Sequence, residues 1–283
     1  MNESSKLAAA SPRIGVFDSG FGGLTVLRAL LDSIPGAEFF YLGDTARLPY
    51  GSKSQATVAR YAVESAQLLE SYGAQYLVIA CNTASALALD AIRAAARVPV
   101  LGVIETGAES AAAASVTRDV LVLATDATVQ SHAYAEACDE RGLRGLEKAC
   151  PLLVPLIEEG WTEDDSTSAV TRQVLRIYLD QALADAIARG YALDTVLLGC
   201  THYPLLREML KSTLPPGMKI LDSAEATARR VRGQLETAGL LAAHGSPNRC
   251  HFYATDSVNK FRALGSRFLG QPIDRVELID LGG

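Results

Sequence analysis

The chain has 283 residues, of which 49% are hydrophobic and 20% charged, and its formal net charge is −6. This balance is typical of a globular enzyme of one large or two modest domains and excludes a disordered chain. The negative charge argues against nucleic acid or an anionic membrane surface as a partner. No stretch approaches the roughly 18 apolar residues that a membrane-spanning helix needs.

The five cysteines do not form the pattern of a disulfide framework or a zinc cluster. Their number is odd and no C-x-x-C pair occurs; they are Cys81, Cys138, Cys150, Cys200 and Cys250. Residues 1–12 hold no apolar run long enough for a signal peptide, and we expect them to be a disordered leader. Reduced thiols and no signal segment together predict a cytoplasmic protein without a metal site.

The first half alternates strands and helices. The strand 14–17 ends at Asp18-Ser19-Gly20, and a helix runs from 24 to about 33. This turn lacks the lysine of a P-loop and the last glycine of G-x-G-x-x-G, so it does not predict nucleotide binding. A second strand, 38–42, leads into a turn-rich loop that holds Leu48-Pro49-Tyr50-Gly51. A helix over 55–72 then leads to the strand 76–79 and Cys81, and a strand over 98–104 ends at Glu105.

The second half repeats this order. The strand 120–124 ends at Thr125, and the segment 151–157 leads, as a strand, to Glu158. A helix over 168–189 precedes the strand 195–198 and Cys200, and the strand 218–221 ends at Asp222. The tail, 250–269, predicts one more strand and an amphipathic helix that could return to the first half. The pattern predicts an α/β fold with parallel sheets, a site at the carboxyl ends of the strands, and an internal duplication.

Cys81 and Cys200 share one local setting, because each follows an apolar strand and precedes the start of a helix. Backbone N–H groups and the positive end of a helix dipole lie beside a thiol placed in this way. Two such thiols on opposite sides of a substrate carbon suit one reaction. The thiolate removes a proton from one face while the other thiol supplies a proton to the opposite face, which inverts the carbon.

Charged and neutral groups at the same strand ends can support that chemistry. Asp18, His202 and Glu158 are candidates to tune the proton affinity of the thiols. Neutral donors there suit a bound carboxylate, and they are Ser19, Tyr50, Asn82, Thr83, Thr125, Thr128 and Thr201.

Each of these residues also has a purely structural interpretation. A cysteine on a strand is commonly a small buried hydrophobe, which is the interpretation we keep for Cys138, Cys150 and Cys250. Asp18 could simply cap a helix, and His202 could hold a loop. Glu159, next to Glu158, is the alternative inward-facing carboxylate.

The motifs resemble those of the glutamate racemase family, in the cofactor-independent aspartate/glutamate racemase superfamily. The resemblance covers about residues 14 to 256 and rests on the segments 15–24, 48–51, 80–84, 155–160 and 199–204. Alanine at 124 and serine at 52 depart from the residues common in the family, and neither removes a proposed catalytic group.

The resemblance implies two pseudo-symmetric α/β domains, each a mostly parallel sheet flanked by helices, with the active site in the cleft between them. We expect residues 1–105 and 215–283 to form the first domain and 106–214 the second. By resemblance Cys81 and Cys200 are the acid/base pair, which Asp18, His202 and Glu158 assist. The implied contacts with the substrate are Asp18, Ser19, Tyr50, Gly51, Asn82, Thr83, Thr125, Thr128, Thr201 and His202.

The resemblance further implies a homodimer that needs no pyridoxal phosphate, metal or nucleotide and supplies D-glutamate for bacterial peptidoglycan. Two alternatives stay open at this point. One is a sister specificity, aspartate or hydantoin racemization. The other is a binding protein without catalytic activity that regulates a partner.

Overall fold

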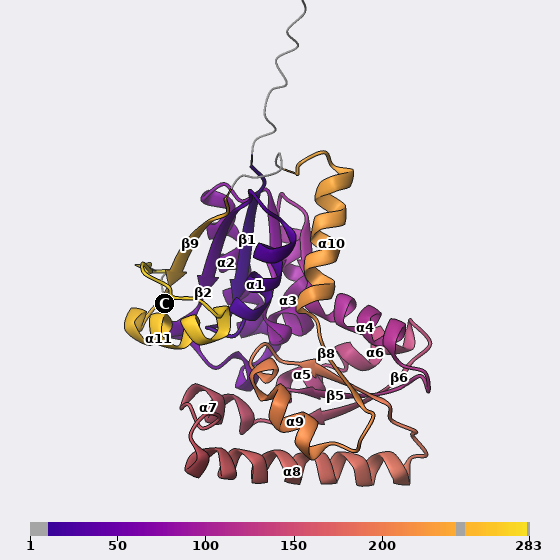
Figure 1. The fold of residues 1–283 in the computed structure, drawn as a ribbon. Helices are drawn as coiled ribbons and strands as arrows, with labels where there is room; N and C mark the ends of the chain where they lie inside the picture. The colour runs from indigo at the N-terminus through magenta and orange to yellow at the C-terminus, as the bar shows by residue number, and fades with distance from the viewer. Residues whose placement is uncertain (1–10, 242–246, 282–283) are drawn as a thin grey trace, which may run out of the picture.

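The computed structural model describes residues 11–241 and 247–281, and its strands form two separate parallel sheets (Figure 1). The predicted leader therefore lies outside the described residues, except for positions 11 and 12. The first sheet has the strand order β10-β9-β2-β1-β3-β4. Its strands are β1 (Arg13–Asp18), β2 (Glu38–Gly43), β3 (Tyr76–Ile79), β4 (Val100–Gly102), β9 (Arg249–Ala254) and β10 (Glu277–Leu278).

Helices cover both faces of the first sheet. Two of them, α2 (Gln55–Ser71) and α3 (Asn82–Ala95), pack against each other on one face, where their side chains join Phe17, Leu42 and Ile79. The opposite face is covered by α1 (Leu24–Ser33), α10 (Ala224–Thr237) and α11 (Val258–Leu269). A sheet buried on both faces explains why its central strands are continuous apolar runs.

The second sheet has the order β6-β5-β7-β8 and is also parallel throughout. Its strands are β5 (Asp119–Ala124), β6 (Arg144–Ala149), β7 (Thr195–Gly199) and β8 (Lys219–Asp222). The helices of this half are α4 (Val103–Ala114), α5 (Asp126–Gln130), α6 (Ala133–Asp139), α7 (Leu153–Glu158), α8 (Asp165–Ala188) and α9 (Arg207–Thr213). Three short 3-10 helices complete the described elements: η1 (Thr45–Arg47), η2 (Tyr50–Ser52) and η3 (Tyr203–Leu206).

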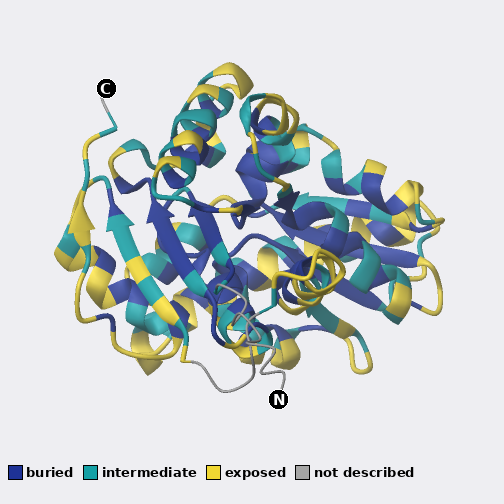
Figure 2. Cartoon of the chain, turned by 90° about the horizontal axis from the view of Figure 1, so that it is seen from above, coloured by how far each residue is buried: buried dark blue, intermediate teal, exposed yellow. Residues whose placement is uncertain are grey.

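The two sheets repeat one topology. The order β2-β1-β3-β4 in the first matches β6-β5-β7-β8 in the second, so the predicted duplication is confirmed at the level of strand order. The central strands of both halves, β1 and β3 in the first and β5 and β7 in the second, are almost wholly buried, and Figure 2 shows buried strands in each half. The largest buried cluster contains residues of both halves, among them Leu24, Leu123 and Val196. The halves therefore share a continuous apolar contact.

Two predictions about secondary structure were wrong. The segment 151–157 forms helix α7 and not a strand, because Leu153 and Ile157 bury one helical face and Pro155 lies in the first turn, where proline is tolerated. Glu158 is therefore the last residue of a helix. The strand predicted over 98–104 is only β4, and Glu105 lies in the first turn of α4. Strand β6 is not predicted from the sequence, because Arg144, Glu147 and Lys148 interrupt any apolar pattern there.

The carboxyl-terminal segment returns to the first sheet, where β9 pairs with β2. Strand β8 pairs with β7 and thus belongs to the second sheet. The expected domain boundary at residue 214 would instead assign β8 to the first domain. The domain division as a whole stays a prediction.

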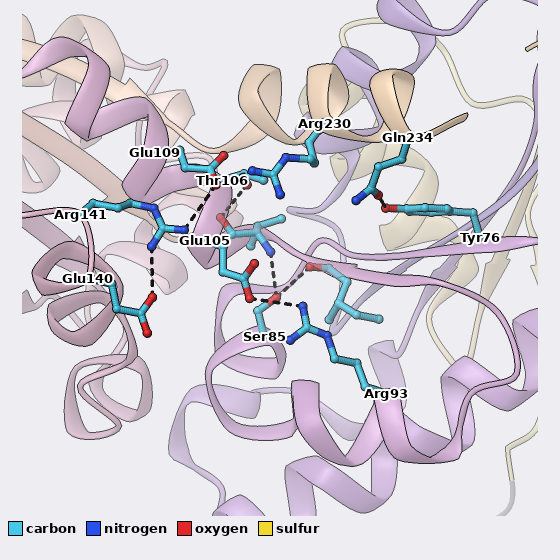
Figure 3. Close-up of polar contacts among 12 residues, drawn as sticks. Tyr76, Ser85, Arg93, Glu105, Thr106, Glu109, Glu140, Arg141, Arg230 and Gln234 are labelled. Atoms are coloured by element: carbon cyan, nitrogen blue, oxygen red, sulfur yellow. Dashed lines mark hydrogen bonds and ion pairs between the residues drawn. The ribbon is translucent and has the colours of Figure 1, made fainter. Parts of the chain in front are cut away.

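The chain crosses between the halves twice, from β4 into α4 and from β8 into α10. The two crossing helices are joined by a hydrogen bond between Thr106 Oγ1 and Thr227 Oγ1 at 2.7 Å. Figure 3 shows Glu109 of α4 between two arginines, Arg141 in the turn after α6 and Arg230 of α10. The Thr106–Thr227 hydrogen bond and the Glu109–Arg230 ion pair therefore hold the crossing helices α4 and α10 together.

Candidate active site

Cys81 lies where β3 ends and occupies the N-cap position of α3. Its sulfur accepts a hydrogen bond from the Ala84 N–H at 3.4 Å, and its thiol donates to Ser19 Oγ at 3.4 Å. The residue is 5% exposed. Burial and the nearby Asp18 carboxylate raise the pKa of Cys81 to about 12, so the resting side chain is a neutral thiol.

Asp18 ends β1, the neighbour of β3 in the sheet, and is buried. One carboxylate oxygen accepts a hydrogen bond from the Gly20 N–H at 2.9 Å. The other, Oδ1, has no hydrogen-bond partner among the described residues. Burial raises the pKa of Asp18, while the positive charge of His202 opposes this shift. A buried oxygen without a partner, next to a thiol, is suited to a ligand or to a proton in transit.

Cys200 follows β7 and is 6% exposed. His202 Nδ1 lies 4.0 Å from its sulfur, and His202 Nε2 lies 3.1 Å from Glu158 Oε1. Burial lowers the pKa of His202, but the hydrogen bonds to Cys200 and Glu158 outweigh it and raise this pKa to about 10. The imidazole is therefore protonated at neutral pH, with a sulfur on one side and a carboxylate on the other.

Glu158, and not Glu159, is the inward-facing carboxylate of α7. Burial raises the pKa of Glu158, but the hydrogen bond and charge of His202 outweigh burial and lower it overall. Lys260 of α11 lies 3.3 Å from the second oxygen of Glu158. Glu159 is exposed. The structure thereby decides between the two carboxylates that the sequence left open.

The turn after β1 touches the turn after β7. A Cβ atom on Gly22 would lie 2.3 Å from Thr201 Oγ1 and 2.5 Å from His202 Nδ1, so only glycine fits there. Thr25 Oγ1 donates to the Thr201 carbonyl at 3.4 Å. Cys81 contacts the turn after β1 through Ser19, and Cys200 contacts His202, so the two cysteines adjoin two segments that touch each other.

Three threonine hydroxyls form a second contact between the halves. Thr83 of α3 lies 3.0 Å from Thr125 and 3.4 Å from Thr128, and Thr125 and Thr128 are 2.9 Å apart. A Cβ atom on Gly51 would lie 3.3 Å from Thr125, which puts the 48–51 loop beside this cluster. Residues predicted to contact the substrate thus come together from three separate segments.

Two residues that were not predicted as part of the site hold predicted site residues in place. Asp44, fully buried, accepts from the Tyr50 hydroxyl at 2.5 Å, from Arg47 Nε at 2.7 Å and from Thr255 Oγ1 at 2.9 Å. The Tyr50 hydroxyl is thus directed into the first half. The position of Asp44 at the end of a strand, like that of Asp18, was the available signal. The second missed residue is Tyr134, whose hydroxyl donates to Asn82 Oδ1 at 2.6 Å. It follows no strand and offered no such signal.

Other candidate features of the sequence are structural. Cys138 and Cys150 are buried in hydrophobic clusters, and Cys250 is half-buried against one. Within residues 11–241 and 247–281, no three His, Cys, Asp or Glu side chains are grouped to hold a metal ion. No helix in the same part of the chain is long and apolar enough to span a bilayer.

Two parallel sheets of matching order, with a cysteine after the corresponding strand of each, define the class as a duplicated α/β protein. The model of the Asp/Glu/Hydantoin racemase family matches residues 22–231. The chain belongs to this family, and it is an enzyme of the racemase class.

Individual relatives agree with this assignment over nearly their whole length. The glutamate racemase of Koribacter versatilis is 51% identical, over 96% of this chain and 98% of that protein. The crystal structure of glutamate racemase from Thermus thermophilus in complex with beta-chloro-D-alanine is 42% identical, with a TM-score of 0.83 over 97% of this chain and 98% of that one. The enzyme from Francisella tularensis in complex with D-glutamate is 33% identical, with a TM-score of 0.85 over 96% and 98%.

Proposed function

We propose that this protein interconverts L- and D-glutamate by proton transfer at the α-carbon, with Cys81 and Cys200 as the two acid/base residues. The observation that carries the proposal is the buried setting in which each cysteine has its own partner. Ser19, which follows Asp18, lies 3.4 Å from the Cys81 sulfur, and His202, paired with Glu158, lies 4.0 Å from the Cys200 sulfur. Two differently supported thiols suit the removal of a proton from one face and its delivery to the other.

The protons balance within this pair. A thiolate on one side takes the α-proton and becomes a thiol, leaving a carbanion that the carboxylate of the substrate stabilises. The thiol on the other side gives its proton to the opposite face and becomes a thiolate. The imidazolium of His202, 4.0 Å from the Cys200 sulfur, is placed to pair with a thiolate there. Asp18 Oδ1, which has no hydrogen-bond partner among the described residues, is our candidate to accept a proton or to bind the substrate ammonium group.

Glutamate is favoured over aspartate by similarity, since the relatives with the higher identities are glutamate racemases. The threonine cluster of residues 83, 125 and 128, with Asn82 and Thr201, supplies neutral donors for the carboxylates of such a substrate. All of these groups are buried or half-buried, and we propose that the two halves move apart to admit the substrate. The cleft, the supply of D-glutamate to peptidoglycan, the cytoplasmic location and the homodimer belong to the same proposal.

The test is turnover of the purified protein without added cofactor. L-glutamate should lose its circular dichroism signal, and in heavy water the inverted product should carry deuterium at the α-carbon. Faster turnover of aspartate than of glutamate would reassign the specificity, because one methylene group is a small discrimination. Absence of turnover with glutamate, aspartate and hydantoins would sink the proposal.

A further inference from the structure

Tyr134 contacts the residues next to both proposed catalytic cysteines. Its hydroxyl donates to Oδ1 of Asn82, the residue after Cys81, at 2.6 Å. Its ring lies against the residue before Cys200, since a Cβ atom on Gly199 would lie 2.8 Å from Tyr134 Cε2. Tyr134 belongs to α6 of the second half and Asn82 to α3 of the first. One side chain therefore connects the two cysteine turns.

The hydroxyl can act here only as a neutral donor. Tyr134 is 0% exposed, and burial raises its pKa well above the ordinary value. An amide has one end that accepts and one that donates. Because the Tyr134 hydroxyl occupies Oδ1 of Asn82, the amino end, Nδ2, is the end directed away from Tyr134. A donor held in this way suits a carboxylate of the substrate.

The ring itself is fixed on two sides. Besides the contact at Gly199, a Cβ atom on Gly107 of α4 would lie 3.3 Å from both the hydroxyl oxygen and Cε1 of Tyr134. Gly107 lies on the helix that crosses between the halves, and Gly199 ends β7. The position of the hydroxyl is thus set by the backbone of the second half.

We propose that Tyr134 is a positioning residue, which holds the Asn82 amide in the orientation that binds substrate and aligns the Cys81 turn with the Cys200 turn. The proposal rests on the function proposed above. The Asn82 amide should adopt the binding orientation only while the two turns are together. Tyr134 thus links the arrangement of the two halves to the binding of substrate.

The experiment is a double-mutant cycle on purified full-length protein with glutamate as substrate. Tyr134→Phe removes the hydroxyl and keeps the ring. We expect kcat/KM to fall about 10- to 100-fold, mainly through a higher KM, as for a lost hydrogen bond to a buried group. In the background of Asn82→Ala, the same change should cost less than about 3-fold, because no amide remains to be oriented.

The matched control is Tyr76→Phe, which also removes a buried hydroxyl from a hydrogen bond. Tyr76 donates to Gln234 of α10 (Figure 3), a residue outside the proposed site, and the variant should keep wild-type kcat/KM. Equal fold-losses from Tyr134→Phe in both backgrounds would show a purely structural role and overturn the proposal. So would wild-type kinetics of Tyr134→Phe.

If Tyr134→Phe does not yield folded protein, Gly107→Ala decides the question in the same cycle. The added methyl group would press on the Tyr134 side chain without removing its hydroxyl. The resulting loss of kcat/KM should also vanish in the Asn82→Ala background. A wild-type protein without racemase activity would sink the proposed function. An active wild type with an unaffected Tyr134→Phe would sink only the role of Tyr134.

Discussion

Nε2 of His202 lies 3.1 Å from Oε1 of Glu158, and this contact joins the loop after β7 to the last residue of α7. The neighbouring carboxylate, Glu159, is exposed. Two adjacent glutamates therefore provide a matched pair, of which only one touches the proposed site. Comparing variants of these two glutamates distinguishes a role in catalysis from the general effect of removing a negative charge.

We expect Glu158→Gln to lower kcat for glutamate racemization about 10- to 100-fold, because the His202 imidazolium loses its anionic partner. Glu159→Gln should leave kcat within about 2-fold of the wild type, as expected for an exposed group. Steady-state kinetics in both directions measure the effect. Equal losses in the two variants would contradict the assignment of Glu158.

The raised pKa of His202 also predicts a pH dependence of stability. A pKa raised from 6.5 to about 10 stabilises the fold fully below pH 6.5, and this contribution is lost as the pH rises through about 10. Between pH 7 and 10 the free energy of unfolding of the wild type should therefore fall more steeply than that of His202→Asn. The difference is at most about 1.4 kcal/mol per pH unit. Denaturant unfolding at several pH values measures it, and parallel slopes would contradict the predicted protonation.

The paired cysteines predict that either one is indispensable. Cys81→Ala and Cys200→Ala should each lower kcat by at least about 10²- to 10⁴-fold, the range supplied by general acid–base groups, without loss of the fold. Cys138→Ala is the control, because this thiol is buried in a hydrophobic cluster of α6 and the second sheet. It should lose stability and keep kcat. Full activity in either of the first two variants would defeat the two-base mechanism.

Replacing Asp44 should lower the stability of the fold, although Asp44 takes no direct part in the proposed proton transfer. Asp44→Asn leaves Arg47 and the Tyr50 hydroxyl with a weaker, neutral partner in a buried setting. We expect a loss of about 3 kcal/mol in the free energy of unfolding. Asp185→Asn removes an exposed carboxylate that also pairs with an arginine, and it should change stability by less than about 0.5 kcal/mol. Similar losses in the two variants would show that burial of Asp44 is not the deciding factor.

Much of the fold could be predicted because its central strands are buried on both faces and read as apolar runs. The edge strand β6 could not, since Arg144, Glu147 and Lys148 are tolerated where one side of a strand lies open. The sequence of helix α7 predicts a strand because its six residues are too few to show a helical period, and Pro155 disfavours a helix interior.

By itself, the sequence determined the strand–turn–helix units that carry Asp18, Cys81 and Cys200, because these are local patterns of apolar residues, glycines and helix starts. Only the tertiary structure decided which side chains from distant parts of the chain meet. The contacts of Tyr134 with Asn82, Glu158 with His202, and Gly22 with Thr201 join residues 44 to 179 positions apart in the chain. No periodicity encodes such contacts, since they depend on how the two sheets are oriented toward each other by the crossing helices and the shared apolar core.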